Sequence, residues 1–318
     1  MEFPDGLLTV LDERSHYLRN PDLIAVGTAK HCLFIDGAGK TFELATPSAA
    51  AWSALMQELA APLAGTLLKQ RLAQLAKADR DFLEEMLKIG LLVEGRDPAA
   101  LARLRDCVLT DNQGYHLARG EPQCGHLVVA LTGSIVAGLM APVILSLAYS
   151  GYPREFDVLL TETALRFVTR DLFESYGIRT WVDAFERRDG IRVPHVSLAG
   201  SADCVLVMPA SAAAIRRLAH ATCTDLLSMT VAATTAPVVV VPVMNTAMWN
   251  HAAVQRNVGQ LREDGVYVVE PGLIFKAAAL VERADPMYGG PGTLWRGPLA
   301  VMQTLSAVLA HRKKLQSV

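Results

Sequence analysis

The sequence predicts an α/β protein in which helices cover both faces of a parallel sheet, preceded by a small winged helix-turn-helix-like domain. After about residue 124, five apolar runs rich in Val and Leu alternate with helical stretches: LVVALT, FDVLLT, CVLVMP, VVVVPV and VYVVEP. Strands buried on both faces have this composition. Earlier residues are mixed, with charges throughout. We therefore expect two domains, residues 1–120 and 121–318.

The first segment predicts a hairpin followed by three short helices and a strand. Residues 31–44 alternate around a glycine-rich turn, and Ser48 can cap a helix that runs to Leu59. Further helices are predicted over 66–75 and 80–89, before the extended run LLVEG. This order suggests a winged helix-turn-helix. DNA binding is disfavoured, because the second helix carries only Lys69 and Arg71 as cations and the net charge is −2.

Residues 127–153 contain no charge and are long enough to cross a bilayer. A Thr-Gly-Ser break, Pro142 and Gly151 instead favour a buried strand, a turn and a buried helix. The N-terminus has early acids and no signal-peptide pattern. We therefore expect a cytoplasmic protein without a membrane segment.

The five cysteines form no CxxC pair and no metal-ligand spacing with histidine, so no metal is expected. The number is odd, which favours reduced thiols. Cys204 and Cys223 lie in apolar patterns, which predicts two small buried side chains.

Residues that directly follow the apolar runs are the candidates for a ligand site, because ligands of such sheets bind beyond the carboxyl ends of the strands. Gly133 and Ser134 follow the first run and open a helix, where backbone N–H groups can receive a phosphate; a plain tight turn is the alternative. Thr161 and Ser211 occupy equivalent places after other runs.

His195, in a short helix before the third run, is the candidate general base; a structural hydrogen-bonding role is the alternative. His220 and His251 are rivals on Ala-rich helices, but neither falls at a strand end. Asn245 follows the fourth run and can cap a helix over 246–264, a role compatible with ligand binding.

The order of His195, PASAAA (209–214), CTDLLS (223–228) and PVMNTAMW (242–249) resembles the flavin-dependent cysteine decarboxylase superfamily. That superfamily holds epidermin-type peptidyl-cysteine decarboxylases, phosphopantothenoylcysteine decarboxylases and halotolerance-type flavoproteins. The resemblance implies a flavodoxin-like sheet, homo-oligomers of trimers or their multiples, and FMN bound at subunit interfaces.

The resemblance also implies roles for single residues. His195 and Asn245 would be catalytic, with Asn245 binding the substrate carboxylate, while Met248 and Trp249 would form the wall of the substrate site. The implied cofactor-binding residues are Gly133, Ser134, Thr161, Pro209, Ala210, Ser211, Asp225 and Met244. Ala213 and Ala214 depart from the family's PASANT motif, and His220 is a candidate to compensate for the lost polar groups.

The implied activity is FMN-dependent oxidative decarboxylation of a C-terminal cysteine in a ribosomally made peptide, which leaves an aminoenethiol. Coenzyme A enzymes of the superfamily reduce this group again with a cysteine located after the Asn motif. This chain has no cysteine after Cys223, so its flap-like segment 272–298 lacks that donor. The first segment resembles leader-binding domains of peptide-tailoring pathways, which suggests a precursor peptide as partner.

Three alternatives stay open. A phosphopantothenoylcysteine-type decarboxylase could use another proton donor. A flavin prenyltransferase has a similar sheet, but the complete PVMNTAMW motif counts against it. A non-catalytic FMN-binding regulatory protein would fit the loss of PASANT, whereas the presence of His195 and Asn245 argues against it.

Overall fold

The computed structural model describes most of the chain from residue 122 onward and parts of the chain before it. The described residues are 11–20, 23–36, 39–45, 55, 58–59, 61–73, 92–101, 122–270, 272–273, 291–292 and 297–317. The predicted helix over 80–89 lies outside them, so the winged helix-turn-helix remains a prediction.

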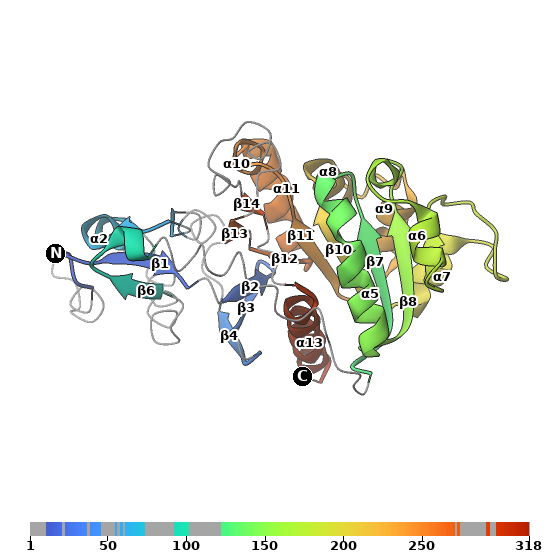
Figure 1. Ribbon diagram of the computed structural model, residues 1–318, viewed down its shortest axis with the longest axis horizontal. Helices are drawn as coiled ribbons and strands as arrows, with labels where there is room; N and C mark the ends of the chain where they lie inside the picture. Colours follow the sequence, from blue (N-terminus) through green and yellow to red (C-terminus); the bar gives the residue numbers. More distant parts are fainter. Residues whose placement is uncertain are drawn as a thin grey trace.

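Six parallel strands form the centre of the fold (Figure 1). They are β7 (Cys124–Leu131), β8 (Pro153–Leu160), β9 (Arg179–Trp181), β10 (Cys204–Ala210), β11 (Val238–Pro242) and β12 (Tyr267–Val269). All five predicted apolar runs are strands, which confirms the α/β class; the three-residue β9 was missed because it is too short to show a pattern.

The six strands lie in the order β9-β8-β7-β10-β11-β12. This is the 3-2-1-4-5-6 order of doubly wound folds, and it differs from the 2-1-3-4-5 order of flavodoxin. The chain adds β8 and β9 on one side of β7 and then crosses to the other side for β10. The switch point between β7 and β10 is the place where such sheets bind ligands.

Helices cover both faces because alternate side chains of each strand point to opposite sides. Leu127, Val129 and Leu131 contribute to the core beneath α5 (Ala141–Ser150) and α13 (Gly297–Gln316). Val128 and Ala130 contribute to the opposite core. That face is covered by α7 (Pro194–Ser201), α8 (Ala212–Ala219), α9 (Leu226–Ala233) and α11 (Ala252–Glu263).

The uncharged segment 127–153 folds as predicted into a strand, a turn and a buried helix, here β7, the 3₁₀ helix η1 (Ile135–Leu139) and α5. No helix among the described residues is long and apolar enough to cross a membrane.

Short helices η2 (Ala164–Arg166) and α6 (Arg170–Glu174) connect β8 to β9. The predicted helix over 246–264 is two helices, α10 (Thr246–Trp249) and α11, because His251 caps the second one.

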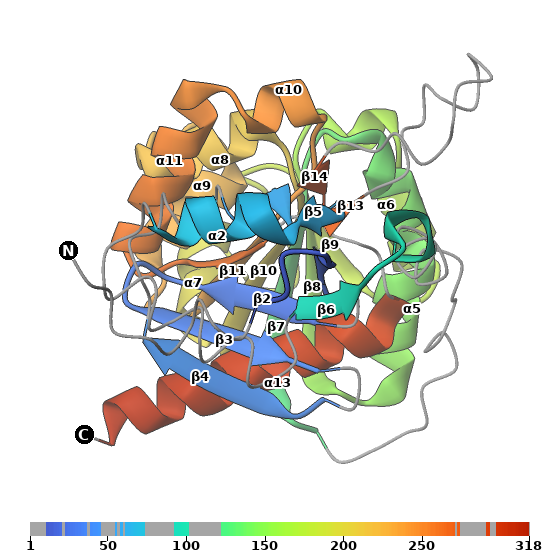
Figure 2. The ribbon, with the colours of Figure 1, turned by 90° about the vertical axis from the view of Figure 1, so that its left-hand side faces the viewer.

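Strands from the first segment extend the main sheet. β2 (Ile24–Gly27) pairs antiparallel with β12, and β3 (His31–Ile35) and β4 (Thr41–Ala45) form the predicted hairpin beside it. Figure 2 shows α13 running along these strands. The boundary at residue 120 stays a prediction, but the sheet itself includes strands from both sides of it.

A smaller sheet lies apart from the main one (Figure 1). It contains β1 (His16–Arg19) between β5 (Leu63–Ala64) and β6 (Leu92–Gly95), with α2 (Gly65–Ala73) following β5. The predicted extended run LLVEG corresponds to β6. The ends of the predicted flap segment form a two-stranded pair, β13 (Gly272–Leu273) with β14 (Pro291–Gly292).

Thr132 joins the two strands at the switch point. Its Oγ1 donates to the carbonyl oxygen of Pro209 at 2.7 Å and accepts from the backbone N–H of Ser211 at 2.9 Å. The side chain is fully buried. A buried hydroxyl that both donates and accepts links the ends of the two strands, because it bonds to residues 209 and 211 at the same time.

Thr132→Val should lower the free energy of unfolding by about 1 kcal/mol or more, because the partly buried Ser211 N–H and the Pro209 carbonyl oxygen lose their shared partner. Urea denaturation measures this change. Thr132→Ser keeps the hydroxyl and should be closer to the wild type. Equal stability of the Val variant and the wild type would contradict the role given to this hydroxyl.

Candidate functional site

The turn after β7 brings Gly133 and Ser134 to the carboxyl edge of the sheet. A Cβ on Gly133 would lie 2.6 Å from the Cβ of Thr163, so only glycine lets the two turns pack this closely. The Ser134 hydroxyl accepts from the N–H of Val136 and caps η1. The predicted tight turn is therefore present, and the polar site predicted at the same residues stays a prediction.

Thr161 follows β8 and lies beside that turn. Its N–H donates to the Leu131 carbonyl oxygen at 3.1 Å, and its hydroxyl is 3.4 Å from that of Thr163. Thr161 also borders a cavity of about 630 Å³ between the ends of β8 and β9 and the start of α9. A cavity of this size is typical of small-molecule sites.

Asp225 lines the same cavity, and its carboxylate already has several partners. It caps α9 by accepting from the Ser228 N–H at 2.8 Å, and it forms an ion pair with Arg217 at 3.0 Å. Both Asp225 and Arg217 line the cavity, so a cation and a carboxylate face its interior.

The PASAAA segment ends β10 and begins α8. Pro209 and Ala210 are buried, and the Ser211 hydroxyl caps α8 by accepting from the Ala214 N–H. Ala213 is exposed, whereas Ala214 is fully buried. The missing carboxamide at position 213 would therefore lie at the surface beside this strand end.

His220 lies at the other end of α8, about 10 Å along the helix axis from Ala213. Its Nε2 is 3.2 Å from the Asn257 Oδ1. The suggested compensation by His220 finds no support, because the helix separates the two positions.

Asn245 is exposed after β11, and its side chain is held in one orientation. Its Oδ1 accepts from the Met248 N–H at 2.8 Å, so the expected capping bond is present. Met248 is 45% exposed, while Trp249 is completely buried in the core together with Met244. Of the two predicted wall residues, only Met248 therefore reaches the surface of this chain.

His195 is partly buried near the start of α7, and its Nδ1 is buried without a hydrogen-bond partner. In Figure 1, α7 lies on the β8–β9 side of the sheet and α10 lies toward β12. Leu198 of α7 and Trp249 of α10 contribute to the core on the same face of the sheet, although α7 and α10 lie toward opposite edges of the sheet in Figure 1. The rival His251 caps α11 by accepting from the Ala253 N–H.

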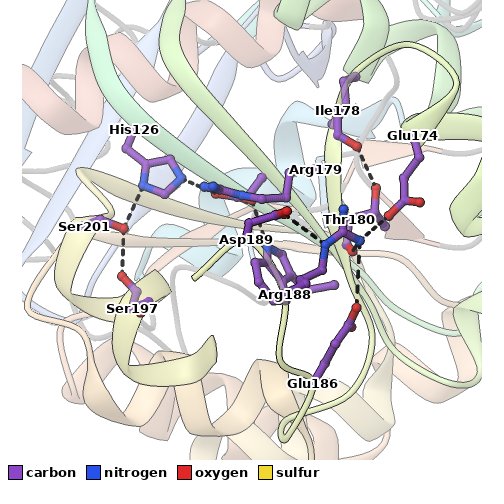
Figure 3. Close-up of polar contacts among 12 residues, drawn as sticks. His126, Glu174, Ile178, Arg179, Thr180, Glu186, Arg188, Asp189, Ser197 and Ser201 are labelled. Atoms are coloured by element: carbon purple, nitrogen blue, oxygen red, sulfur yellow. Dashed lines mark hydrogen bonds and ion pairs between the residues drawn. The ribbon is translucent and has the colours of Figure 1, made fainter. Parts of the chain in front are cut away.

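A buried polar network contacts the C-terminal end of α7 (Figure 3), and the sequence did not predict it. His126 Nε2 is 2.7 Å from Asp157 Oδ2, and its Nδ1 is 2.9 Å from the Ser201 hydroxyl at the end of α7. Arg179 and Trp181 also donate to Asp157. A His and an Asp inside otherwise apolar strands were the available signal, since buried polar groups need partners.

The electrostatics of this network favour an ionised Asp157. Burial raises the pKa of Asp157, but hydrogen bonds from Arg179, His126 and Trp181 outweigh it and lower the pKa to about 2. The carboxylate is completely buried, so its three donors replace water.

The four cysteines in the described part of the chain are free thiols. Cys204 is buried as predicted. Cys223 is exposed, and the prediction of a buried side chain is wrong there, because the residue sits in the loop between α8 and α9 with a φ of 41°.

The strand order and the helices on both faces define a doubly wound α/β protein. The sequence matches the family described as Flavoprotein over residues 118–285, more than half of the chain. The chain belongs to the Flavoprotein family, which confirms the expected flavin as the class of cofactor.

Two curated relatives and one solved structure illustrate the similarity. The chain is 36% identical over 125 residues to the coenzyme A biosynthesis bifunctional protein CoaBC of Bacillus subtilis, covering 39% of this chain and 31% of that protein. It is 30% identical over 148 residues to mersacidin decarboxylase of a Bacillus species, covering 46% of this chain and 73% of the relative. The chain spans about a third of the length of the CoaBC proteins it matches.

The solved structure described as FMN-dependent cysteine decarboxylase SpaF is 30% identical, with a TM-score of 0.48; the match covers 59% of this chain and 96% of SpaF. Together with the family match, the two curated relatives make this chain a member of a family that includes decarboxylases.

Acid should remove the stability that Asp157 provides. Because its pKa is lowered in the folded protein, this contribution is complete above about pH 4 and is lost as the pH falls toward 2; it amounts to about 2 kcal/mol. Denaturation of the wild type and of Asp157→Asn at several pH values measures it. The difference between the two proteins should shrink across that range.

Asp189→Asn is the matched control, since Asp189 is an exposed acid paired with Arg188 in the same region. Its difference from the wild type should stay small at every pH. A constant difference between Asp157→Asn and the wild type from pH 6 to pH 2 would contradict the ionised, hydrogen-bonded state of Asp157.

Proposed function

We propose that this protein is an FMN-dependent decarboxylase that oxidatively decarboxylates the C-terminal cysteine of a ribosomally made peptide to an aminoenethiol. The observation that carries the proposal is the gathering of Gly133, Ser134, Ser211 and Asn245 at the carboxyl ends of β7, β10 and β11 in a Flavoprotein-family chain. Asn245 belongs to the PVMNTAMW motif, whose resemblance to the cysteine decarboxylases is complete.

The residues at this edge fit FMN. Hydroxyl groups of Ser134 and Ser211 and the backbone N–H groups of two helix starts suit a phosphate ester. Ile135 and Leu139 lie on η1 beside them and are 59% and 66% exposed, which suits a flat aromatic ring system. Among the remaining predicted cofactor residues, Pro209, Ala210 and Met244 are buried and would shape the backbone rather than contact FMN. The other two are Thr161 and Asp225.

A bound flavin supplies a two-electron acceptor for the substrate. The substrate thiol loses two electrons and two protons and becomes a thioaldehyde, and the carboxylate β to this electron sink leaves as carbon dioxide. Asn245 binds that carboxylate through its carboxamide N–H₂, because its Oδ1 is already used by Met248. His195 receives a proton from the cysteine, and its unpartnered Nδ1 is available to orient the ring or to exchange a proton.

The resemblance to the cysteine decarboxylases implies FMN at subunit interfaces, so two copies of the chain would together form one substrate site. Exposed apolar side chains support association: Phe185 is 75% exposed and Val196, next to His195, is 57% exposed. We therefore propose a homo-oligomer, a trimer or a multiple of trimers, with His195 from one copy and Asn245 from another.

The first segment would recognise the leader of the precursor peptide, as its resemblance to leader-binding domains suggests. β1 would offer a pairing edge for an extended peptide only if β5 or β6 moved, because both of its edges are occupied. The leader therefore has to contact other parts of this segment, and a cysteine-ending core peptide would enter the flavin site.

Phosphopantothenoylcysteine is the second candidate substrate. The specific observation in its favour is the similarity to CoaBC, which reaches a higher identity than the similarity to mersacidin decarboxylase. The lack of a cysteine after Cys223 favours the oxidative product over the reduced one for either substrate. Mass spectrometry distinguishes the oxidative product from the reduced product, because the aminoenethiol is two hydrogen atoms lighter than the aminoethanethiol.

The purified protein should show the visible absorption of bound oxidised flavin, and the chromophore released on denaturation should be FMN. Anaerobic addition of a cysteine-ending peptide should bleach this absorption as the substrate is oxidised. A protein that takes up FMN but is bleached neither by a peptide nor by phosphopantothenoylcysteine would be a binding protein and would contradict the enzymatic proposal.

His195→Ala should retain FMN and lower turnover by about 10²- to 10⁴-fold, the usual contribution of a general base. His220→Ala removes an exposed imidazole from α8 and should leave turnover unchanged. Single-turnover flavin reduction and carbon dioxide release measure both variants. Wild-type turnover in His195→Ala would exclude His195 from the mechanism.

Asn245→Asp should keep the helix cap and lose activity. An aspartate still accepts from the Met248 N–H, so the melting temperature should hold, but its charge repels the substrate carboxylate. We expect kcat/KM to fall by about tenfold or more, since like charges in contact cost several kcal/mol. Unchanged kcat/KM would show that the carboxylate binds elsewhere.

A further inference from the structure

His31, Glu43 and His311 meet at a place far from the flavin site. His31 is on β3, Glu43 on β4 and His311 on α13, so the three come from the N-terminal hairpin and the C-terminal helix. One potential ligand atom from each residue lies within 4.8 Å of the others. The sequence predicts no metal site, because these residues are separated by up to 280 positions and show no ligand spacing.

His311 is the residue that points to a missing ligand. Its side chain is only 2% exposed, and its Nε2 is buried without a hydrogen-bond partner. The Nε2 lies 3.2 Å from Glu43 Oε1, but the two atoms are not aligned as a hydrogen bond. Leaving a buried imidazole nitrogen unsatisfied is costly, and a metal ion held between these atoms would remove the cost.

The second nitrogen of His311 is held as it is in metal sites. Tyr267 Oη is 2.8 Å from His311 Nδ1, and this contact fixes the ring with Nε2 facing His31 and Glu43. A ligating histidine almost always binds such a partner through its other nitrogen.

Glu43 is prepared as a monodentate ligand. Lys314 Nζ donates to its Oε2 at 2.6 Å, which leaves Oε1 facing the two histidines. Ligating carboxylates are commonly oriented by a second partner in this way.

Two of the ligand-atom distances match a four-coordinate zinc site, and all three ligand atoms lie within 4.8 Å of one another. Glu43 Oε1 lies 3.3 Å from His31 Nδ1 and 3.2 Å from His311 Nε2. In a tetrahedral site with ligands near 2.0–2.1 Å from the metal, neighbouring ligand atoms are about 3.3 Å apart. The two imidazoles and one carboxylate exclude Mg²⁺ and Ca²⁺, which prefer oxygen ligands alone.

We propose that His31, Glu43 and His311 bind one Zn²⁺ ion, with water as the fourth ligand, and that this ion fastens the N-terminal hairpin to the C-terminal helix. The site is independent of the flavin and of the proposed reaction. Without metal, the same three residues form only an ion-pair cluster with Lys314, and that arrangement is the alternative the experiment has to exclude.

Isothermal titration of Zn²⁺ into full-length protein, freed of affinity tag and treated with chelator, tests the proposal. One equivalent per chain should bind, and Zn²⁺ should raise the melting temperature because it binds the folded state only. Mg²⁺ should do neither. X-ray absorption at the zinc edge should show two imidazoles and oxygen ligands at about 2.0–2.1 Å.

Variants separate this site from other zinc-binding places. His31→Gln and Glu43→Gln change partly exposed side chains and should abolish the binding of one equivalent, whereas His220→Ala, an exposed histidine on α8, should bind zinc as the wild type does. Tyr267→Phe should weaken binding about 10- to 100-fold by releasing His311 Nδ1.

Two results would overturn the proposal. One is the absence of a stoichiometric, saturable Zn²⁺ site in the wild type. The other is undiminished binding in His31→Gln and Glu43→Gln while their melting temperatures without metal equal that of the wild type, because the ion would then sit elsewhere.

Discussion

The hydroxyl of Thr132 is the contact on which the geometry of the sheet's carboxyl edge depends. Strands β7 and β10 are neighbours in the sheet but far apart in the chain. The sheet continues with β8 and β9 beyond β7 and with β11 and β12 beyond β10. By bonding both Pro209 and Ser211, Thr132 holds the PASAAA segment against the Gly133–Ser134 turn. The starts of η1 and α8 are therefore held next to each other, and the phosphate contacts proposed for Ser134 and Ser211 require that they are.

A second buried polar group, Asp157, fixes the helix that carries His195. The carboxylate receives hydrogen bonds from Arg179 and Trp181 on β9 and from His126 on β7, and His126 in turn contacts Ser201 at the end of α7. Burying a charged group costs free energy, and removing one partner from such a network leaves a buried charge without a partner. α7 thus has a polar anchor at one end and packs on α9 along its length, so its position does not rest on apolar contacts alone.

Strands β2 to β4 and the C-terminal helix α13 meet at the far edge of the main sheet. β2 continues the sheet beyond β12, where Arg262 and Glu270 form a buried ion pair and the Glu270 N–H donates to Ala25. α13 then packs across the hairpin, with Lys314 and His311 reaching Glu43. Burial of Val301, Leu305 and Val308 places the last helix in the same core as the first strands, so this edge is covered by sequence from both ends.

The sequence by itself determined the α/β class, the five longer parallel strands and the polar residues that end them, because buried strands need continuous apolar runs and strand ends need turn residues. It also identified Asn245 and the capping role that the structure shows, since both depend on neighbours in the chain. Only the tertiary structure decided the strand order, the pairing of β2 with β12, the burial of Trp249 and the meeting of His31 with Glu43 and His311. These features join residues distant in sequence, and a local pattern carries no information about which distant element will pack against it.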